Sequence, residues 1–302
     1  MSEATTKSYK YRAFGVNIQS EFEIPEFLPA QFGAPDVTIQ FGNIPSSLEN
    51  PEKKGLRYQL AQQEFLLWLD NVAGYYVQNG NSVQIQKKDT STMQEVRLFL
   101  AGLVFAALLH QRGVFALHAN AIKNGNEAFL VCGNSGAGKS TLTREFLNAG
   151  YRLLSDDISV LEEHQGNIYV QPAFPFIKLW KDSMEHLELN EVGGAKLREQ
   201  IDKYGFSLKD EFHDEMLPVK NIFALVPHNK PEYKREQLKG IEKFNTLKNH
   251  TYRFQFISNT TRPFHFELIN KIATRIPVHR ITRPQAPINT ADLKDVIEEL
   301  LE

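Results

Sequence analysis

The chain has 302 residues, of which 42% are hydrophobic and 23% are charged, and its formal net charge is −2. This length and apolar content support one large core or two smaller ones, and we expect two domains. A charge so close to zero gives no bulk attraction to nucleic acid or to an anionic membrane, so we expect neither as a partner.

A single cysteine, Cys132, excludes an intramolecular disulfide and fits a reducing, cytoplasmic location. It closes an apolar stretch, so we expect it to be buried as a small hydrophobic residue rather than to be reactive. Residues 1–7 lack the apolar segment of a signal peptide.

The first part of the chain is rich in predicted strands. We expect residues 1–8 to form a flexible tail and residues 9–112 to form a smaller, mainly antiparallel β domain with a closing helix. Alternating apolar segments separated by turn signals indicate the strands. The expected strands are residues 11–18, 36–41, 56–60, 64–69, 74–78 and 82–86.

The closing helix is expected to begin at a cap provided by Thr90 or Ser91 and to end at Gly113. It is apolar over most of its circumference. Its most apolar part, residues 98–109, is shorter than the roughly 20 residues that cross a bilayer, so we expect a buried helix.

Residues 131–141 read Val-Cys-Gly-Asn-Ser-Gly-Ala-Gly-Lys-Ser-Thr and contain the pattern G-x-x-x-x-G-K-S. In this pattern the glycines turn backbone N–H groups toward a phosphate chain, Lys139 can reach the β- and γ-phosphates, and Ser140 can hold Mg²⁺. The following helix directs its positive dipole end at the anion. An apolar strand-like run before the motif and an amphipathic helix after it favour a nucleotide site over a glycine-rich surface turn.

Two adjacent carboxylates, Asp156 and Asp157, follow the apolar residues 153–154. Holding them together is costly unless a cation or a transferable proton relieves the repulsion. A Mg²⁺–nucleotide complex would relieve it, with one carboxylate ordering the metal shell and the other accepting a proton from an attacking hydroxyl. The alternative is a turn in which an aspartate only caps backbone amides.

Three further polar residues have two interpretations each. His118 lies in a strand-like stretch before the glycine-rich motif, where a hydrogen-bonded core histidine is the commoner outcome. Lys178, within an apolar stretch, can reach phosphate, although extension of its ammonium group to water is favoured. Arg253 can meet a phosphate or pair with surface carboxylates.

The remaining elements complete an α/β domain expected over residues 113–302. Residues 183–212 look helical and then loop-like, 217–226 strand-like, and 276–281 form a last strand. For residues 228–248 a solvated hairpin with a surface helix is favoured over a basic docking face. A closing helix over 290–301 is expected to be capped by Thr290 or Asp292.

The order of His118-Ala119-Asn120-Ala121, the glycine-rich motif and Leu153-Leu154-Ser155-Asp156-Asp157 resembles the HPr kinase/phosphorylase superfamily. Within it, the chain is similar to the HPr-kinase-like serine kinases of peptide natural-product (lasso peptide) gene clusters. That likeness extends to Lys-Leu-Trp at 178–180, Ser-Glu-x-x-x-Pro at 20–25 and Arg-x-x-Arg-Pro at 280–284. The Glu-x-x-Gly-x-Gly signature of HPr kinases is missing, which argues against HPr as the substrate.

The resemblance implies a P-loop-containing, HPr kinase-like catalytic domain that uses ATP and Mg²⁺. Asp156 would be the general base, Asp157 and Ser140 would associate with the metal, Lys139 would bind phosphate, and His118 would neighbour the active site. Related kinases associate, so a homo-oligomer is expected. The residues expected to bind the triphosphate are Gly133, Asn134, Ser135, Gly136, Ala137, Gly138, Lys139, Ser140 and Thr141.

The leading hypothesis is a phosphotransferase that moves the γ-phosphoryl group of ATP to a serine-type hydroxyl of a peptide or small acceptor. Lys139, Mg²⁺ and either Lys178 or Arg253 would neutralise the developing charge. The alternatives are a non-catalytic nucleotide-sensing module and a plain NTPase. The paired aspartates weigh against sensing alone, because it needs no base.

Overall fold

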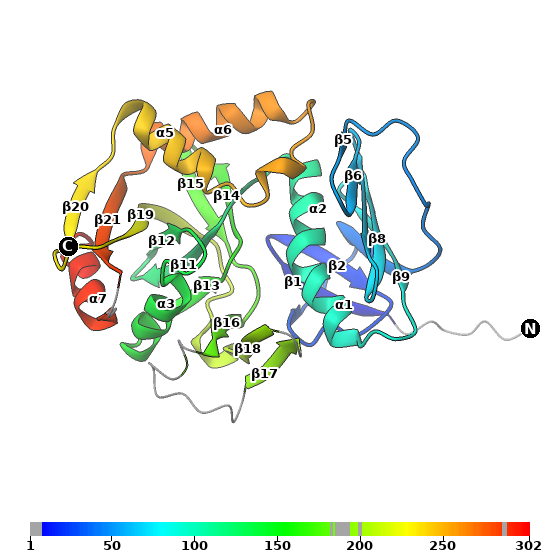
Figure 1. Cartoon of the computed structure of the whole chain (residues 1–302), viewed down its shortest axis with the longest axis horizontal. Helices are drawn as coiled ribbons and strands as arrows, with labels where there is room; N and C mark the ends of the chain where they lie inside the picture. The colour runs from blue at the N-terminus through cyan, green and yellow to red at the C-terminus, as the bar shows by residue number, and fades with distance from the viewer. Residues whose placement is uncertain (1–7, 182–183, 185–193, 199–200, 286–288) are drawn as a thin grey trace, which may run out of the picture. The chain divides into compact units, whose positions relative to one another are not determined.

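The computed structural model describes residues 8–181, 184, 194–198, 201–285 and 289–302, and its fold is mixed α/β with several sheets. The chain divides into two compact units (Figure 1). The first comprises Met1–Val114 and Arg253–His265, and the second comprises Phe115–Tyr252 and Phe266–Glu302. That residues 9–112 and 113–302 fold as separate domains stays a prediction.

The first unit contains a nine-stranded sheet in the order β3-β1-β2-β4-β9-β8-β7-β6-β5. Its pairings are antiparallel except β2 with β4 and β4 with β9. The strand expected over 11–18 is in fact a hairpin, because Phe14 and Gly15 both adopt positive φ, as a tight two-residue turn demands. The strands are β1 (Tyr9–Ala13), β2 (Val16–Ser20), β3 (Leu28–Pro29), β4 (Val37–Phe41), β5 (Lys53–Lys54), β6 (Tyr58–Leu60), β7 (Glu64–Leu69), β8 (Ala73–Gln78) and β9 (Ser82–Lys87).

The closing helix of this unit is one continuous run formed by α1 (Met93–Phe99), the π-helical η1 (Leu100–Val104) and α2 (Phe105–Gln111). Its cap is Thr92, not Thr90 or Ser91, because Thr92 forms a reciprocal capping box with Glu95. Among the described residues, this run alone is long and apolar enough to cross a membrane. Most of its apolar window is buried within the structure, as expected for a core helix.

The second unit is built on another nine-stranded sheet, whose central path runs β10-β14-β15-β19-β12-β11-β13. β12 lies between β11, which is antiparallel to it, and β19, which is parallel. β21 extends the parallel part beyond β19. The strands are β10 (Phe115–Leu117), β11 (Ala119–Asn124), β12 (Glu127–Gly133), β13 (Arg152–Ser155), β14 (Ser159–His164), β15 (Asn167–Gln171), β19 (Leu217–His228), β20 (Lys234–Gln237) and β21 (Val278–Pro284).

Helices cover both faces of this sheet (Figure 1). Leu130 and Cys132 of β12 pack in one cluster with residues of α5 and α6, whereas Phe129 and Val131 pack in another with residues of α3 and α7. This alternation explains why β12 is apolar throughout, since both of its faces are buried. The helices are α3 (Lys139–Asn148), α5 (Gly240–Asn249), α6 (Arg262–Arg275) and α7 (Thr290–Glu298), with 3-10 turns η2 (Lys209–Glu211) and η3 (Phe254–Phe256).

Three expectations for the later part of the chain were wrong. The described residues between 194 and 207 form strands, β17 (Gly194–Arg198) and β18 (Ile201–Ser207), which join β16 (Phe176–Trp180) in a three-stranded sheet. Residues 183, 185–193 and 199–200 of the expected stretch lie outside the described residues. β20 pairs with β21 rather than with β19, so no hairpin forms there, whereas the surface helix expected after it is present as α5. α7 is capped by Asn289, whose side chain accepts two backbone N–H groups.

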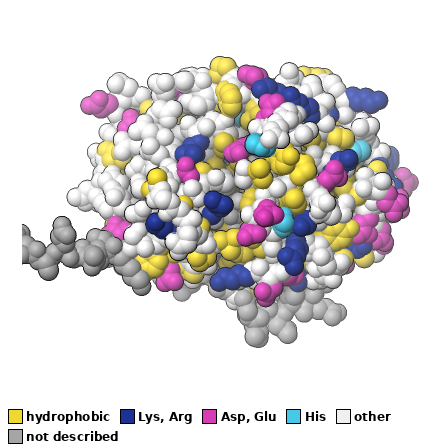
Figure 2. All heavy atoms as spheres, turned by 180° about the vertical axis from the view of Figure 1, so that it is seen from behind, with side chains coloured by type: hydrophobic (Ala, Val, Ile, Leu, Met, Phe, Trp, Pro, Cys, Tyr) yellow, Lys and Arg dark blue, Asp and Glu magenta, His cyan; other side chains and the backbone are white. Residues whose placement is uncertain are grey.

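The surface drawn in Figure 2 carries Lys and Arg side chains intermingled with Asp and Glu. Such interspersion matches the small net charge of the chain. Specific recognition must therefore come from local arrangements of residues rather than from the electrostatic field of the net charge.

Candidate active site

The glycine-rich loop connects the end of β12 to the first residue of α3, which is the strand-loop-helix setting that the sequence predicts. Gly136 and Gly138 have φ of 80° and 90°, in the left-handed region that favours glycine. A Cβ on Gly133 would lie 3.0 Å from the carbonyl oxygen of Leu225, so the close approach of β19 also requires glycine. The loop residues Asn134, Ser135 and Gly136 are exposed to solvent.

Lys139 begins α3 with its side chain buried against the loop. Its Nζ donates to the carbonyl oxygen of Gly133 at 2.8 Å and lies 3.2 Å from Nε2 of His118. Burial lowers the pKa of Lys139, while the charges of Asp157 and Asp156 act in the opposite direction. These acceptors therefore hold the ammonium group beside Gly133, where the loop begins.

His118 contacts both this lysine and the aspartate pair. An ammonium group can only donate, so Nε2 of His118 must accept and the ring proton must reside on Nδ1. Nδ1 lies 3.0 Å from the carbonyl oxygen of Asp157, to which it donates. Both ring nitrogens are engaged in positioning contacts, which links the loop lysine to the aspartate pair.

Strand register brings these distant residues together. Ala119 of β11 pairs with Cys132 of β12, which places His118 beside the end of β12. Ala121 of β11 pairs with Ser155 of β13, so the aspartates that follow Ser155 emerge at the same edge of the sheet.

Asp156 and Asp157 lie at this edge with different partners. Asp156 accepts from Oγ of Ser140 at 3.3 Å and from the backbone N–H of Lys178 at 3.0 Å. Asp157 accepts from Nζ of Lys178 at 3.3 Å, and its own backbone N–H donates to Asn120 Oδ1 at 3.1 Å. The pair therefore does more than cap a turn, because it contacts the first helical turn after the glycine-rich loop.

The two carboxylates differ in acidity. Burial, and then the charge of Asp157, raise the pKa of Asp156. Burial acts to raise the pKa of Asp157 as well, but the positive charges of Lys178 and Lys203 outweigh it and lower that pKa overall. Asp156 is thus the better proton acceptor of the pair, and Asp157 is the member whose charged form is stabilised.

Lys178 corrects one expectation. Its side chain does not extend to water but is 12% exposed and forms an ion pair with Asp157. The carboxylates act to raise the pKa of Lys178 and outweigh the opposing effect of burial. Lys203, which the sequence analysis missed, acts on the same aspartates from β18, and its Nζ lies 5.4 Å from the ring centroid of Trp180.

Arg253 was expected to meet a phosphate or to pair with surface carboxylates. It belongs to the first unit, where it adopts φ of 51° and precedes the 3-10 turn η3. Its contact with phosphate stays a prediction. Thr141, expected to help bind the triphosphate, is buried in the first turn of α3.

Arg283 of β21 is a second residue that the sequence analysis did not place at the site. It is almost fully buried, and its guanidinium donates to the carbonyl oxygen of Ala137 through Nε at 3.0 Å and Nη2 at 2.9 Å. Nη2 also lies 3.5 Å from the carbonyl oxygen of Gly136. These bonds tie the carbonyl side of the loop to β21 and hold its backbone in place.

Arg283→Met is expected to weaken ATP binding about tenfold and to lower the Tm, because buried loop carbonyls lose their donors. Arg280→Met is the matched control on the same strand, since Arg280 pairs with Glu236 and Glu242 at the surface, where ion pairs contribute little. Calorimetric titration with ATP and thermal unfolding measure both effects. Equal ATP affinity in the two variants would contradict the positioning role of Arg283.

Cys132 is fully buried, which confirms the expectation for this residue. Burial raises the pKa of its thiol to about 12. Because only the thiolate attacks, we expect the folded protein at pH 8 to react with a thiol reagent at least about 100-fold more slowly than the protein in denaturant. A time course of labelling measures this ratio, and rapid labelling of the folded chain would show that the end of β12 opens.

The oxygen atoms near the loop fit Mg²⁺. This ion takes oxygen ligands and is usually bound through one or two carboxylates together with substrate phosphates and water. Ser140 and Asp156 already lie within hydrogen-bond distance of each other, with Asp157 next in sequence. Within the described ranges, no group of three or more His, Cys, Asp or Glu residues could hold a metal without such additional ligands.

No family model matches this chain. No curated protein matches it either. Among solved structures, the chain is similar to the HPr(Ser) kinase/phosphatase from Coxiella burnetii, with a TM-score of 0.32 and 16% sequence identity. The match covers 62% of this chain and 93% of that chain.

Proposed function

We propose that this chain is an ATP- and Mg²⁺-dependent kinase that transfers the γ-phosphoryl group to a serine-type hydroxyl. The observation that carries the proposal is the bond from Ser140 of the glycine-rich motif to Asp156, 3.3 Å between oxygens, with Asp157 beside it. A binding module needs no proton acceptor at this position. A phosphoryl transferase needs one, together with charge neutralisation around the terminal phosphate.

In this proposal each residue has one task. Lys139 neutralises charge on the phosphates. His118 keeps the ammonium group of Lys139 directed to the loop. Asp156 accepts the proton of the attacking hydroxyl. Asp157, paired with Lys178, stays ionised and would associate with Mg²⁺ together with Ser140. When bound, Mg²⁺ supplies charge neutralisation for the phosphates.

The acceptor is proposed to be a peptide or a small hydroxyl compound. The sequence likeness to serine kinases of lasso-peptide gene clusters supports tailoring of a ribosomal peptide. We assign acceptor recognition to the β sheet of the first unit. A cytoplasmic location, association into a homo-oligomer, and a P-loop kinase-like domain over residues 113–302 belong to the same proposal.

Incubation of the pure protein with Mg²⁺ and ATP labelled at the γ-phosphate tests the proposal. The acceptors are peptides ending in serine, matched peptides ending in alanine, and small alcohols. Label on serine peptides but not on alanine peptides supports the kinase. Release of labelled phosphate without transfer indicates an NTPase, and binding without either reaction indicates a nucleotide sensor.

A further inference from the structure

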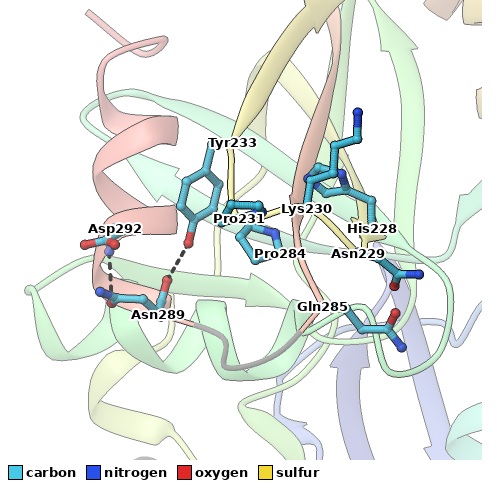
Figure 3. A pocket seen from close by; sticks show the side chains of 9 residues that line it. All are labelled: His228, Asn229, Lys230, Pro231, Tyr233, Pro284, Gln285, Asn289 and Asp292. Atoms are coloured by element: carbon cyan, nitrogen blue, oxygen red, sulfur yellow. Dashed lines mark hydrogen bonds between the residues drawn. The ribbon is translucent and has the colours of Figure 1, made fainter.

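A cavity of about 650 Å³ opens at the carboxyl ends of β19 and β21 (Figure 3). These strands are parallel neighbours, and β12, which carries the glycine-rich loop at its own carboxyl end, is the next parallel strand. Ligands of open α/β sheets bind outside the carboxyl ends of such strands. The lining residues are His228, Asn229, Lys230, Pro231, Tyr233, Pro284, Gln285, Asn289 and Asp292.

One side chain joins this cavity to the loop. The guanidinium of Arg283 donates to the carbonyl oxygen of Ala137 in the loop, and through Nη1 to the carbonyl oxygen of Pro284 in the cavity wall, at 2.6 Å. The guanidinium group of Arg283 therefore contacts both the glycine-rich loop and the wall of the cavity. A ligand whose anionic part rests on the loop can place its next part in the cavity.

The lining suits an uncharged ligand part with hydrogen-bonding edges. Its formal charges, one lysine and one aspartate, cancel, whereas the loop has the cation Lys139 bonded to it. Asn229 and Gln285 carry amides that both donate and accept. In Figure 3 the ring of Tyr233 stands across the two prolines from Asn229, with its hydroxyl bonded to the carbonyl oxygen of Asn289 at 3.1 Å.

The size is also appropriate, because small-molecule sites commonly enclose about 300–1,000 Å³ and combine apolar walls with a few polar groups. The cavity meets both conditions, with Pro231, Pro284 and Tyr233 as apolar surface beside the amides. A free anion in the cavity would be attracted by Lys230 and repelled by Asp292, so the lining does not favour it. A base and ribose would find flat surfaces and hydrogen-bonding partners.

We propose that this cavity holds the nucleoside part, base and ribose, of the nucleotide whose phosphates lie on residues 133–141. The inference rests on the proposed nucleotide-dependent function and locates its second binding element. Amides of Asn229 and Gln285 bond the edge of the base, and the apolar wall packs against its face. The loop alone holds the phosphate chain.

The test compares ATP with inorganic tripolyphosphate, which lacks a nucleoside, as ligands in calorimetric titrations with Mg²⁺. Asn229→Trp and Gln285→Trp fill the cavity from two segments, at residues that are exposed and therefore tolerate a large side chain. Asn249→Trp, at the exposed end of α5, is the matched control. Thermal unfolding verifies that each variant is folded.

The wild-type chain is expected to bind ATP at least about tenfold more tightly than tripolyphosphate. Both cavity variants are expected to lose that advantage while binding tripolyphosphate unchanged, and the control is expected to keep it. Equal affinity of the wild-type chain for the two ligands, or wild-type ATP binding in both cavity variants, would overturn the inference. A variant that changes only the KM for the acceptor would overturn it too.

Failure of the kinase proposal gives a different result. If the wild-type chain and the control select ATP over tripolyphosphate and the cavity variants do not, the nucleoside site stands even when no label reaches an acceptor. If transfer occurs normally in both cavity variants at low ATP concentration, the kinase stands and the nucleoside site does not.

Discussion

Asp156→Asn is expected to lower kcat for phosphoryl transfer by about 10²- to 10⁴-fold while leaving ATP binding in place. The amide keeps an oxygen that accepts from Ser140, so the hydrogen bond of 3.3 Å to the first turn of α3 survives. It cannot accept a proton from the attacking hydroxyl. Burial, and then the charge of Asp157, raise the pKa of the native carboxyl, which makes it a better proton acceptor than an ordinary aspartate.

The comparison with Asp157→Asn separates the two carboxylates. That variant loses the partner of Lys178 and the ionised group beside Ser140, so we expect it to require more Mg²⁺ for half-maximal rate. Asp210→Asn, an exposed aspartate, is the control that should behave as wild type. Initial rates over a Mg²⁺ series, with ATP affinity measured separately, distinguish the cases. Full transfer activity in Asp156→Asn would remove this residue from the base role.

The sequence predicted those parts of the site that depend on neighbours in the chain. The loop between β12 and α3 follows from glycines at fixed positions and from an apolar strand that precedes them. Cys132 could be predicted as buried because it ends that strand. Each of these inferences needs only local pattern, and each agrees with the structure.

Contacts between distant residues could not be predicted in the same way. Lys178 was expected to reach water, because an isolated lysine in an apolar stretch usually does so, yet Asp157 provides a partner 21 residues away. Arg283 bonds to the loop 146 residues earlier in the chain, through the order of parallel strands. A buried charge depends on its partner, and partners are set by strand order rather than by local pattern.

The hairpin at Phe14 and the strands near residue 200 were missed for another reason. Phe14 is a bulky residue with positive φ, and only the following glycine signals a turn. In β17 and β18, charged residues, glycine and apolar residues follow one another without strict alternation, so the strand signal is weak. Lys203 was missed together with that sheet, although it acts on the aspartate pair.

Lys139→Met is expected to abolish both ATP binding and transfer. Lys139 is the buried cation at the foot of the loop, bonded to Gly133 and His118, and methionine has a similar length without the charge. The variant loses the attraction for the phosphates but keeps the packing. Titration with ATP and the transfer assay measure the two losses, and Lys220→Met, at an exposed surface pair, is the control.

Thermal unfolding tests whether this loss is one of charge rather than of fold. Loss of Lys139 removes the cost of burying a charge but also leaves the carbonyl oxygen of Gly133 without this donor, so the readout is the ATP-dependent shift in Tm rather than the Tm of the nucleotide-free protein. ATP should raise the Tm of the wild-type chain and of Lys220→Met, because a ligand that binds only the folded state stabilises it. It should not raise the Tm of Lys139→Met. An ATP-dependent shift in that variant equal to the wild-type shift would mean that the nucleotide binds without this lysine, and the loop would then not be its phosphate site.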